Sequence, residues 1–302
     1  MQTCLECVPC FVRQALDASH LVSNDPSIHE RVLRQTLALA AQLDFQQSPP
    51  WVGQQIHHFL RQATVCDDPY LPAKQQANQF ALALRPMLAE RLAEATDPFA
   101  LATRLAIAGN IIDLGCKTRV RDEEIRRAVE DALRTPLDPQ ALARFRAAVD
   151  AATKILYLAD NAGEIVLDAL LIAKLPVERV TVAVRGRPVI NDATRDDAAA
   201  AGLTELVPII DNGSDVPGTI LASCSSEFRQ QFALADLIIA KGQGNYETLN
   251  DVDQNIWFLL QAKCPVIARD IGCPVGQAVL CTGSRNHTAG THSALSPQGA
   301  NE

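Results

Sequence analysis

Apolar residues in the first half of the chain recur every three to four positions, as Val8, Phe11 and Val12 do. This spacing places them along one face of an α-helix. Breaks such as Asn24-Asp25-Pro26 carry residues that form turns or start helices. The pattern predicts about seven helices and no strand over residues 1–150.

From Lys154 onward, short apolar runs alternate with segments of helical length. The predicted strands are 154–159, 179–184, 205–210, 236–240 and 265–269, and the helical segments include 164–175, 191–201 and 224–233. This alternation predicts an α/β fold with a Rossmann-like, doubly wound parallel sheet. We therefore expect an all-helical domain over 1–150, an α/β domain over 151–281, and a small, polar, disordered tail over 282–302.

The composition is that of an ordinary soluble globular protein, with 48% hydrophobic and 21% charged residues among 302. A net charge of −8 argues against general nucleic-acid binding, because phosphate backbones attract basic surfaces. No apolar run approaches the roughly 20 residues of a membrane span, and the start lacks the features of a signal peptide. Nine cysteines without an export signal indicate reduced thiols. We expect a cytoplasmic protein with no membrane partner.

The most informative feature is Asp160-Asn161, which directly follows the first predicted strand. A short acidic turn between a parallel strand and a helix lies where α/β proteins bind ligands. Carboxylate and amide oxygens suit Mg or Mn better than zinc. An alternative is that Asp160 only caps the following helix.

The other predicted strands also end in polar loops. These loops hold Arg185-Gly186-Arg187-Pro188 with Asn191-Asp192, Asp211-Asn212-Gly213, Lys241-Gly-Gln-Gly-Asn245, and Asp270-Ile271-Gly272. Asp192 could instead be an ordinary helix cap, and Asp211-Asn212-Gly213 a plain turn. Because loops after parallel strands emerge on one edge of the sheet, their polar groups are expected to converge there.

The loop at Lys241 has glycines that let backbone N–H groups approach an anion. It matches neither the Walker A motif nor a GxGxxG dinucleotide fingerprint. The assembly suits metal-assisted hydrolysis of a phosphate ester, in which a divalent cation and a lysine neutralise the phosphoryl oxygens.

Three features of the helical half add candidates. Asn110 and Asp113 fall on one face of an apolar segment, and could line a site or make a core hydrogen bond. Asp68-Pro69-Tyr70 with Lys74 is by default a helix start, and would border a cleft if the two halves close on each other. Cys4, Cys7 and Cys10 could hold a metal, but a complete zinc or iron–sulfur site needs a fourth ligand, so inert or redox-active thiols remain open.

Six motifs in order resemble those of the damage-control phosphatase family, formerly domain of unknown function 89. They are Cys4-Leu-Glu-Cys7-Val-Pro-Cys10, Asp68-Pro69-Tyr70-x3-Lys74, Gly109-Asn110-Ile-Ile-Asp113, Asp160-Asn161-Ala-Gly-Glu164, Arg185-Gly186-x-Pro188-x2-Asn191-Asp192, and Lys241-Gly-Gln-Gly-Asn245-Tyr-Glu247. The cysteine-rich start is similar to that of the prokaryotic branch. The resemblance spans about residues 1–280.

The resemblance implies a metal-dependent phosphatase acting on small phosphorylated metabolites, often damaged or reactive sugar phosphates. It implies that Asp160, Asn161 and Asp192 bind the metal, which could be Mn, Mg, Co or Ni. Asp160 and Lys241 would be catalytic. The phosphate or substrate would contact Lys241, Asn245, Glu164, Asn110 and Asp113.

The alternative from a different class is a protein that binds a phosphorylated or nucleotide ligand without turnover. A methyltransferase-like use of the α/β half is disfavoured, because the loop after the first strand is not glycine-rich.

Overall fold

The computed structural model describes residues 1–109, 130 and 134–283. The chain begins with three helices, α1 (Cys7–Val22), α2 (Pro26–Ala41) and α3 (Pro49–Thr64). Both α2 and α3 start with proline, whose fixed φ and missing N–H suit the first helical position. We call α1–α3 the three-helix cap.

The rest of the described chain builds a sheet and its covering helices. The helices are α4 (Leu71–Glu94), α5 (Pro98–Ala108), α8 (Pro139–Ala151), α9 (Glu164–Ile172), α10 (Arg195–Ala200), α11 (Ser226–Leu234), α12 (Gly242–Leu249) and α13 (Pro265–Ile271). The strands are β1 (Ile155–Leu158), β2 (Val180–Val184), β3 (Ile209–Asp211), β4 (Leu237–Lys241), β5 (Ile256–Gln261) and β6 (Ala278–Thr282).

The sheet has the strand order β3-β2-β1-β4-β5-β6. The first five strands run parallel, and β6 pairs antiparallel with β5. This confirms the predicted Rossmann-like sheet preceded by helices. The order reverses between β1 and β4, and such a switch point is where open α/β sheets bind ligands at their carboxyl edge.

Two hydrophobic clusters cover the two faces of the sheet. One joins the strands to α4, α5, α8 and α9, and the other joins them to α11, α12 and α13. The three-helix cap has a cluster of its own, centred on residues such as Phe11, Ile56 and Leu60. Helices α4, α5 and α8 therefore pack on the sheet, whereas the predicted domain boundary near residue 150 stays a prediction.

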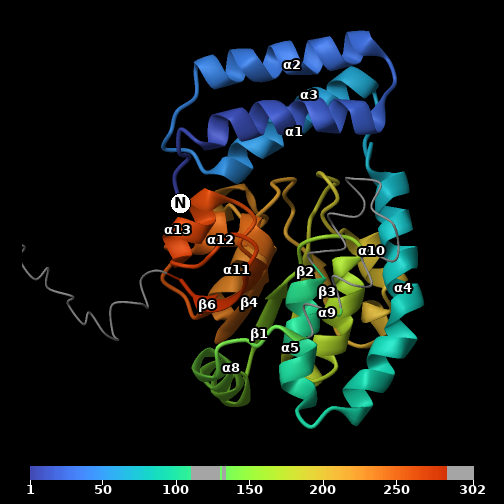
Figure 1. Cartoon of the computed structure of the whole chain (residues 1–302), viewed down its shortest axis with the longest axis vertical. Helices are drawn as coiled ribbons and strands as arrows, with labels where there is room; N and C mark the ends of the chain where they lie inside the picture. Colours follow the sequence, from blue (N-terminus) through green and yellow to red (C-terminus); the bar gives the residue numbers. More distant parts are fainter. Residues whose placement is uncertain (110–129, 131–133, 284–302) are drawn as a thin grey trace, which may run out of the picture.

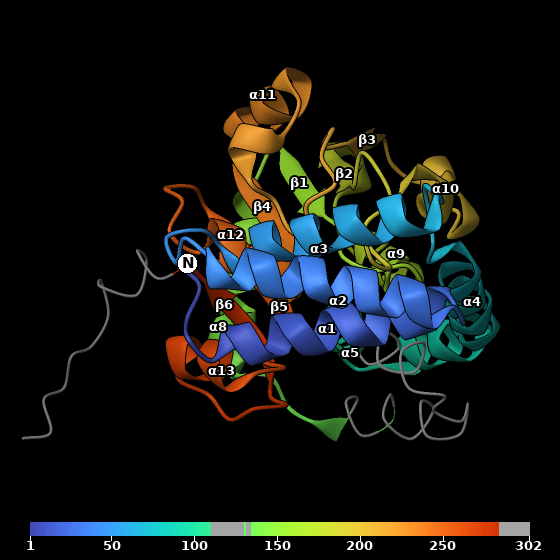
Figure 2. The same ribbon diagram turned by 90° about the horizontal axis from the view of Figure 1, so that it is seen from above.

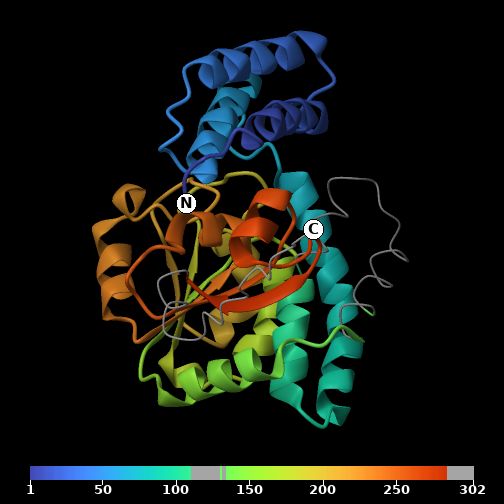
Figure 3. The same cartoon turned by 60° about the vertical axis from the view of Figure 1, so that its left-hand side comes forward.

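The three-helix cap lies over the carboxyl edge of the parallel strands, as Figures 1 and 2 show. Figure 3 shows the same stacking from another side, with the cap above and the sheet below. The chain passes from α3 to α4 through one short connection, residues 65–70. Within the described residues, no helix is both long enough and apolar enough to cross a membrane.

The predicted strand at 265–269 is wrong, because this segment is α13. Pro265 occupies its first turn and Gly272, with φ +81°, ends it in the left-handed conformation. The fifth strand is instead the apolar run Ile256–Gln261, and β6 was not predicted. The third strand begins at Ile209, later than predicted, after a 3-10 turn at Leu203–Glu205. Of the predicted tail over 282–302, Thr282 ends β6, and residues 284–302 lie outside the described residues.

Candidate active site at the carboxyl edge of the sheet

The loops after β1 and β2 are joined by backbone hydrogen bonds. Ala162 N donates to Asn191 O at 2.8 Å, and Ala193 N donates to Asp160 O at 2.7 Å. Asn161 and Asp192 form an isolated β-bridge between these two bonds. The pairing brings Asp160, Asn161 and Asp192 together, although they lie on different strands' loops.

Neither aspartate is a helix cap. The N-cap of α9 is Gly163, and the N-cap of α10 is Thr194, whose capping box is completed by Asp197. The plain-turn alternative does fit Asp211-Asn212-Gly213: the Asp211 carboxylate accepts from Gly213 N at 3.1 Å. The geometry therefore excludes the alternatives in which Asp160 or Asp192 is only an ordinary helix cap.

Arg185, at the end of β2, links the two aspartates. Its Nε donates to Asp192 Oδ2 at 2.6 Å, and its Nη2 lies 3.9 Å from Asp160 Oδ1. The guanidinium is buried and also contacts Thr219 and Asn245. The sequence placed Arg185 in a loop of the site but gave it no role; here it fixes Asp192 beside Asp160.

Asn161 is oriented by two carboxylates. Its Nδ2 donates to Asp160 Oδ2 at 2.8 Å and to Glu164 Oε2 at 3.0 Å. Because ionised carboxylates only accept hydrogen bonds, the amide nitrogen must face them. The amide oxygen of Asn161 is then the atom that remains for a cation or donor from the cleft.

Lys241 does not face the cleft as the sequence predicted. Its Nζ donates to Ala106 O at 2.7 Å, Glu164 Oε1 at 2.5 Å and Asp168 Oδ1 at 2.6 Å, which uses all three of its protons. Burial alone lowers the pKa of Lys241, but the charges of Asp168 and Glu164 outweigh it and raise the pKa. In this arrangement the Lys241 ammonium holds the Glu164 carboxylate in place. The catalytic role of Lys241 stays a prediction.

The alternation of side chains along β4 could have predicted that Lys241 points into the core. Side chains two residues apart point to the same face of a sheet, so Lys241 lies on the face of Leu237 and Ile239. Those two residues belong to the cluster that α5 and α9 cover. The acidic pair Glu164 and Asp168, four residues apart on apolar α9, marks the partner of a buried cation.

Asn245 is likewise occupied by the protein. Its Nδ2 donates to Lys241 O at 2.8 Å, and its Oδ1 accepts from Thr219 Oγ1 at 2.8 Å. It supports Arg185 and the end of β4 in this structure rather than lining the cleft. Asn110 and Asp113, the other predicted substrate contacts, lie outside the described residues.

The predicted glycine loop after β4 is the beginning of α12. Gly242 has φ +76°, and a Cβ added there would lie 1.9 Å from Asp160 Oδ2. Only glycine therefore lets the Asp160 carboxylate rest against the N-terminus of α12. The backbone N–H groups of this first turn, like those of α9, favour a bound anion.

A cavity of about 220 Å³ opens between this edge and the three-helix cap. The α/β part lines it with Asp160, Asn161, Ile190, Asn191, Asp192, Pro217, Gln243, Gly244, Glu247 and Lys263, and the cap with Cys10, Phe11, Gln14, Pro49, Pro50 and Gly53. We call this cavity the cleft. It is smaller than the roughly 300–1,000 Å³ pockets of drug-sized ligands, so it suits a small substrate.

Lys263 is a cleft residue that the sequence interpretation missed. It follows β5, and its positive charge acts to lower the pKa of Asp160. It was missed because the fifth strand was predicted at 265–269, which put the loop after that strand at 270–272. In the structure the loop after β5 is 262–264. The run Ile-Trp-Phe-Leu-Leu was the signal for that strand.

The cap is held to the edge by Asp215. Three side chains on one face of α3 donate to its carboxylate: Gln54 at 2.5 Å, His58 at 2.7 Å and Arg61 at 2.5 Å. Burial tends to raise the pKa of Asp215, but the hydrogen bonds from Gln54 and His58 outweigh it and lower the pKa.

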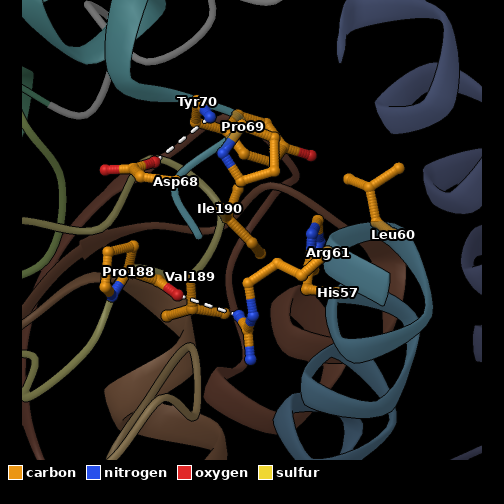
Figure 4. Close-up of a pocket in the computed structure, with 9 residues that line it drawn as sticks. All are labelled: His57, Leu60, Arg61, Asp68, Pro69, Tyr70, Pro188, Val189 and Ile190. Atoms are coloured by element: carbon orange, nitrogen blue, oxygen red, sulfur yellow. Dashed lines mark hydrogen bonds between the residues drawn. The ribbon is translucent and has the colours of Figure 1, made fainter. Parts of the chain in front are cut away.

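Arg61 also donates to Pro188 O at 2.9 Å across a small pocket beside the cleft (Figure 4). Ile190, which lines both cavities, has φ +46°. A β-branched residue in the left-handed conformation is strained, so the packing around Ile190 must hold it there. The same packing fixes the direction of the chain at the next residues, Asn191 and Asp192.

The three-cysteine prediction is only partly addressed by the structure. Cys10 lines the cleft, and burial raises the pKa of the Cys7 thiol to about 11. Within the described residues, no group of three or more His, Cys, Asp or Glu side chains is positioned to hold a metal ion. The role of Cys4, Cys7 and Cys10 stays open.

Comparison with known proteins identifies the family of the chain. Residues 3–279 match the damage-control phosphatase ARMT1-like domain. The chain belongs to the damage-control phosphatase family. This confirms the resemblance seen in the sequence motifs.

Relatives in this family match nearly the whole chain. A damage-control phosphatase of Pyrococcus horikoshii is 34% identical over 93% of this chain and 98% of its own. One from Archaeoglobus fulgidus is 33% identical over 90% and 96%, and an uncharacterized protein of Methanocaldococcus jannaschii is 34% identical over 91% and 93%. A crystal structure of a DUF89 family protein from Pyrococcus horikoshii superposes with a TM-score of 0.85 at 33% identity, covering 94% of this chain and 100% of that one.

Proposed function

We propose that this protein is a metal-dependent phosphatase that hydrolyses small phosphorylated metabolites, such as damaged sugar phosphates, in the cleft. The observation that carries the proposal is the convergence of Asp160, Asn161 and Asp192 at the switch point of the sheet. The names of two relatives support phosphatase activity.

The charges around the site fit a divalent cation. Four buried carboxylates, Asp160, Glu164, Asp168 and Asp192, share two buried cations, Arg185 and Lys241. Burial, followed by the charges of Glu164 and Asp192, raises the pKa of Asp160 well above its ordinary value. This excess of negative charge favours Mn, Mg, Co or Ni over an empty site.

The metal would be held by Asp160, Asp192 and the amide oxygen of Asn161. When bound, it would polarise the phosphoryl group and make water a better nucleophile. Two carboxylates and one amide leave room for water and substrate, as Mg sites usually do.

The protein's own groups would position and stabilise the phosphate. The N-termini of α9 and α12 point N–H groups toward the same edge, and Lys263 adds a positive charge in the cleft. Such preplaced groups stabilise negative charge on the phosphoryl oxygens without reorganisation. Arg185 keeps Asp192 beside Asp160, and Glu164 keeps Asn161 turned toward the cleft.

The test is phosphate release from para-nitrophenyl phosphate and from sugar phosphates by chelator-treated protein, with each metal added back. Asp160→Asn should lower kcat at least about 100-fold, because it removes an anionic ligand. Asp211→Asn, at the end of β3 and outside the cleft, is the matched control and should keep wild-type activity. Binding of sugar phosphates without any metal-dependent release would favour the non-catalytic alternative.

A further inference from the structure

The cleft has two ends of different character. Of the acidic residues that line it, Asp160 and Asp192 lie in the loops after β1 and β2, and Glu247 lies on α12, five residues beyond Gly242. Cys10 and Gln14 of the cap line the same cleft. We call Gln243 and Glu247 the distal pair.

The distance between the two ends suits a small substrate. Gly242 contacts the Asp160 carboxylate, and Glu247 follows five residues later on the same helix. At a rise of 1.5 Å per residue, the two positions lie about 7.5 Å apart along the axis of α12. A phosphate held at the loop end would therefore place the far end of a sugar-sized molecule near Glu247.

Glu247 is held on one side only. Gln243 Nε2 donates to Glu247 Oε1 at 2.9 Å, while Gln243 Oε1 accepts from Lys263 N at 3.2 Å. No hydrogen bond from a described residue reaches Glu247 Oε2. Because the Gln243 amide is fixed at both ends, the carboxylate of Glu247 has a defined direction and an oxygen left for a ligand.

This oxygen can accept a hydrogen bond from a hydroxyl group but repels an anion. Burial raises the pKa of Glu247 to about 7, although Gln243 and the chain's amino group oppose the rise. Among the described residues the Glu247 carboxylate forms no ion pair and accepts only the neutral Gln243 amide, so a second negative charge beside it would be disfavoured. Like charges placed together in an interface are a common means of rejecting a wrong ligand.

We propose that Glu247, oriented by Gln243, determines specificity by accepting a hydroxyl at the end of the substrate remote from the phosphate and by excluding substrates with a second anionic group there. This inference rests on the proposed phosphatase function. It assigns the distal pair to selection and leaves the chemistry to the loop end.

The test compares fructose 6-phosphate with fructose 1,6-bisphosphate as substrates. For the wild-type protein, kcat/KM should be higher for the monophosphate. Glu247→Gln keeps the shape and the bond to Gln243 but removes the charge, so it should lower the monophosphate-to-bisphosphate ratio about tenfold. Glu247→Asp keeps the charge and should retain most of the preference.

Glu178→Gln, on the exposed turn before β2, is the matched control and should leave the ratio unchanged. An unchanged ratio in Glu247→Gln, with normal hydrolysis of para-nitrophenyl phosphate, would overturn the inference.

Binding measurements keep this test separate from the proposed function. Calorimetric dissociation constants for the two sugars should show the same preference and the same loss in Glu247→Gln. Protein that binds the sugars but releases no phosphate would refute the phosphatase proposal alone, and the ratio of dissociation constants would still decide on Glu247. Equal affinity of wild-type protein for both sugars, including no binding of either, would contradict the role of Glu247.

Discussion

The carboxyl edge of the sheet and the three-helix cap enclose the same cleft but are built differently. At the edge, buried charges interlock: Arg185 bridges Asp160 and Asp192, and Lys241 joins Glu164 to Asp168. The cap has its own hydrophobic cluster and is held to the edge by polar contacts to Asp215. The edge is therefore fixed mainly by buried charges within the core of the fold, whereas the cap meets it through the contacts to Asp215 and the packing of Ile190 against the cap's cluster.

This difference separates two tasks. In the proposed function, the groups that would hold the phosphate lie on the edge, where displacement by about 1 Å can cost about 100-fold in rate. The groups that would select the rest of the substrate lie on α12 and the cap. Changes at the edge should therefore cost stability and kcat, and changes at the cap should affect KM and selectivity.

The largest expected effect is that of Lys241→Met on stability. The substitution leaves Glu164 and Asp168 buried without their cation, which typically costs about 3–5 kcal/mol. Urea unfolding should show this loss. Arg195→Met, which breaks the exposed pair with Asp211, is the control and should cost about 0–1 kcal/mol. Equal stabilities for the two variants would mean that the edge is no more interlocked than the surface.

Gly242→Ala should abolish most activity through a steric effect alone. The added methyl group would displace the Asp160 carboxylate, so kcat should fall at least about 100-fold. Gly272→Ala is the matched control, because Gly272 also has positive φ but its Cβ would meet nothing within 4 Å. Both variants should lose about 1–2 kcal/mol from backbone strain, yet only Gly242→Ala should lose activity. Similar kcat values for the two variants would show that the position of the Asp160 carboxylate does not matter for catalysis.

Asp215→Asn should test how firmly the cap is held, without changing the residues proposed to bind the metal. It removes the charge that Arg61 and His58 share, so the cap should close less firmly. KM for sugar phosphates is expected to rise roughly three- to tenfold while kcat changes little. Steady-state kinetics checks this, and a fall in kcat as large as that of Gly242→Ala would show that the two regions are not independent.

The smallest effect concerns pH. Below pH 7 the Glu247 carboxyl is mostly neutral, because burial raises its pKa to about 7, and above pH 7 it is mostly ionised. The groups around it are the Met1 amino group, which lowers this pKa, the amide of Gln243 and the neutral Cys7 thiol. Preference for fructose 6-phosphate over the bisphosphate should thus increase several-fold as pH rises from 6 to 8. Glu247→Gln should remove this dependence, and a wild-type ratio that falls with pH would contradict it.

The sequence predicted the parts of the site that follow from local pattern. The apolar run before Asp160 predicts β1, and a parallel sheet then brings the ends of β1 and β2 to one edge, where Asn161 and Asp192 form a bridge. The order of the six motifs along the chain also indicated the family. The two halves of the chain differ in hydrophobic period, but the sequence did not indicate that α4, α5 and α8 pack on the sheet.

The rest depended on contacts between distant segments. Lys241 could be placed at the end of β4, but its partners on α9 and its contact with Ala106 required the packed structure. Pro265–Ile271 is apolar enough for a strand, and its proline start and glycine end were outweighed in that prediction. Because the fifth strand was misplaced, Lys263 was missed. Glu247 could be recognised as a cleft residue only from the structure, in which the cap encloses the cleft.

The most direct test of the central claim is to locate a bound metal. Crystals grown with Mn should give an anomalous difference peak beside the oxygens of Asp160, Asn161 and Asp192, with ligand distances of about 2.0–2.3 Å. The same peak should vanish in Asp160→Asn crystals. An ordered cleft without such a peak, or a peak only at Cys4, Cys7 and Cys10, would contradict the account.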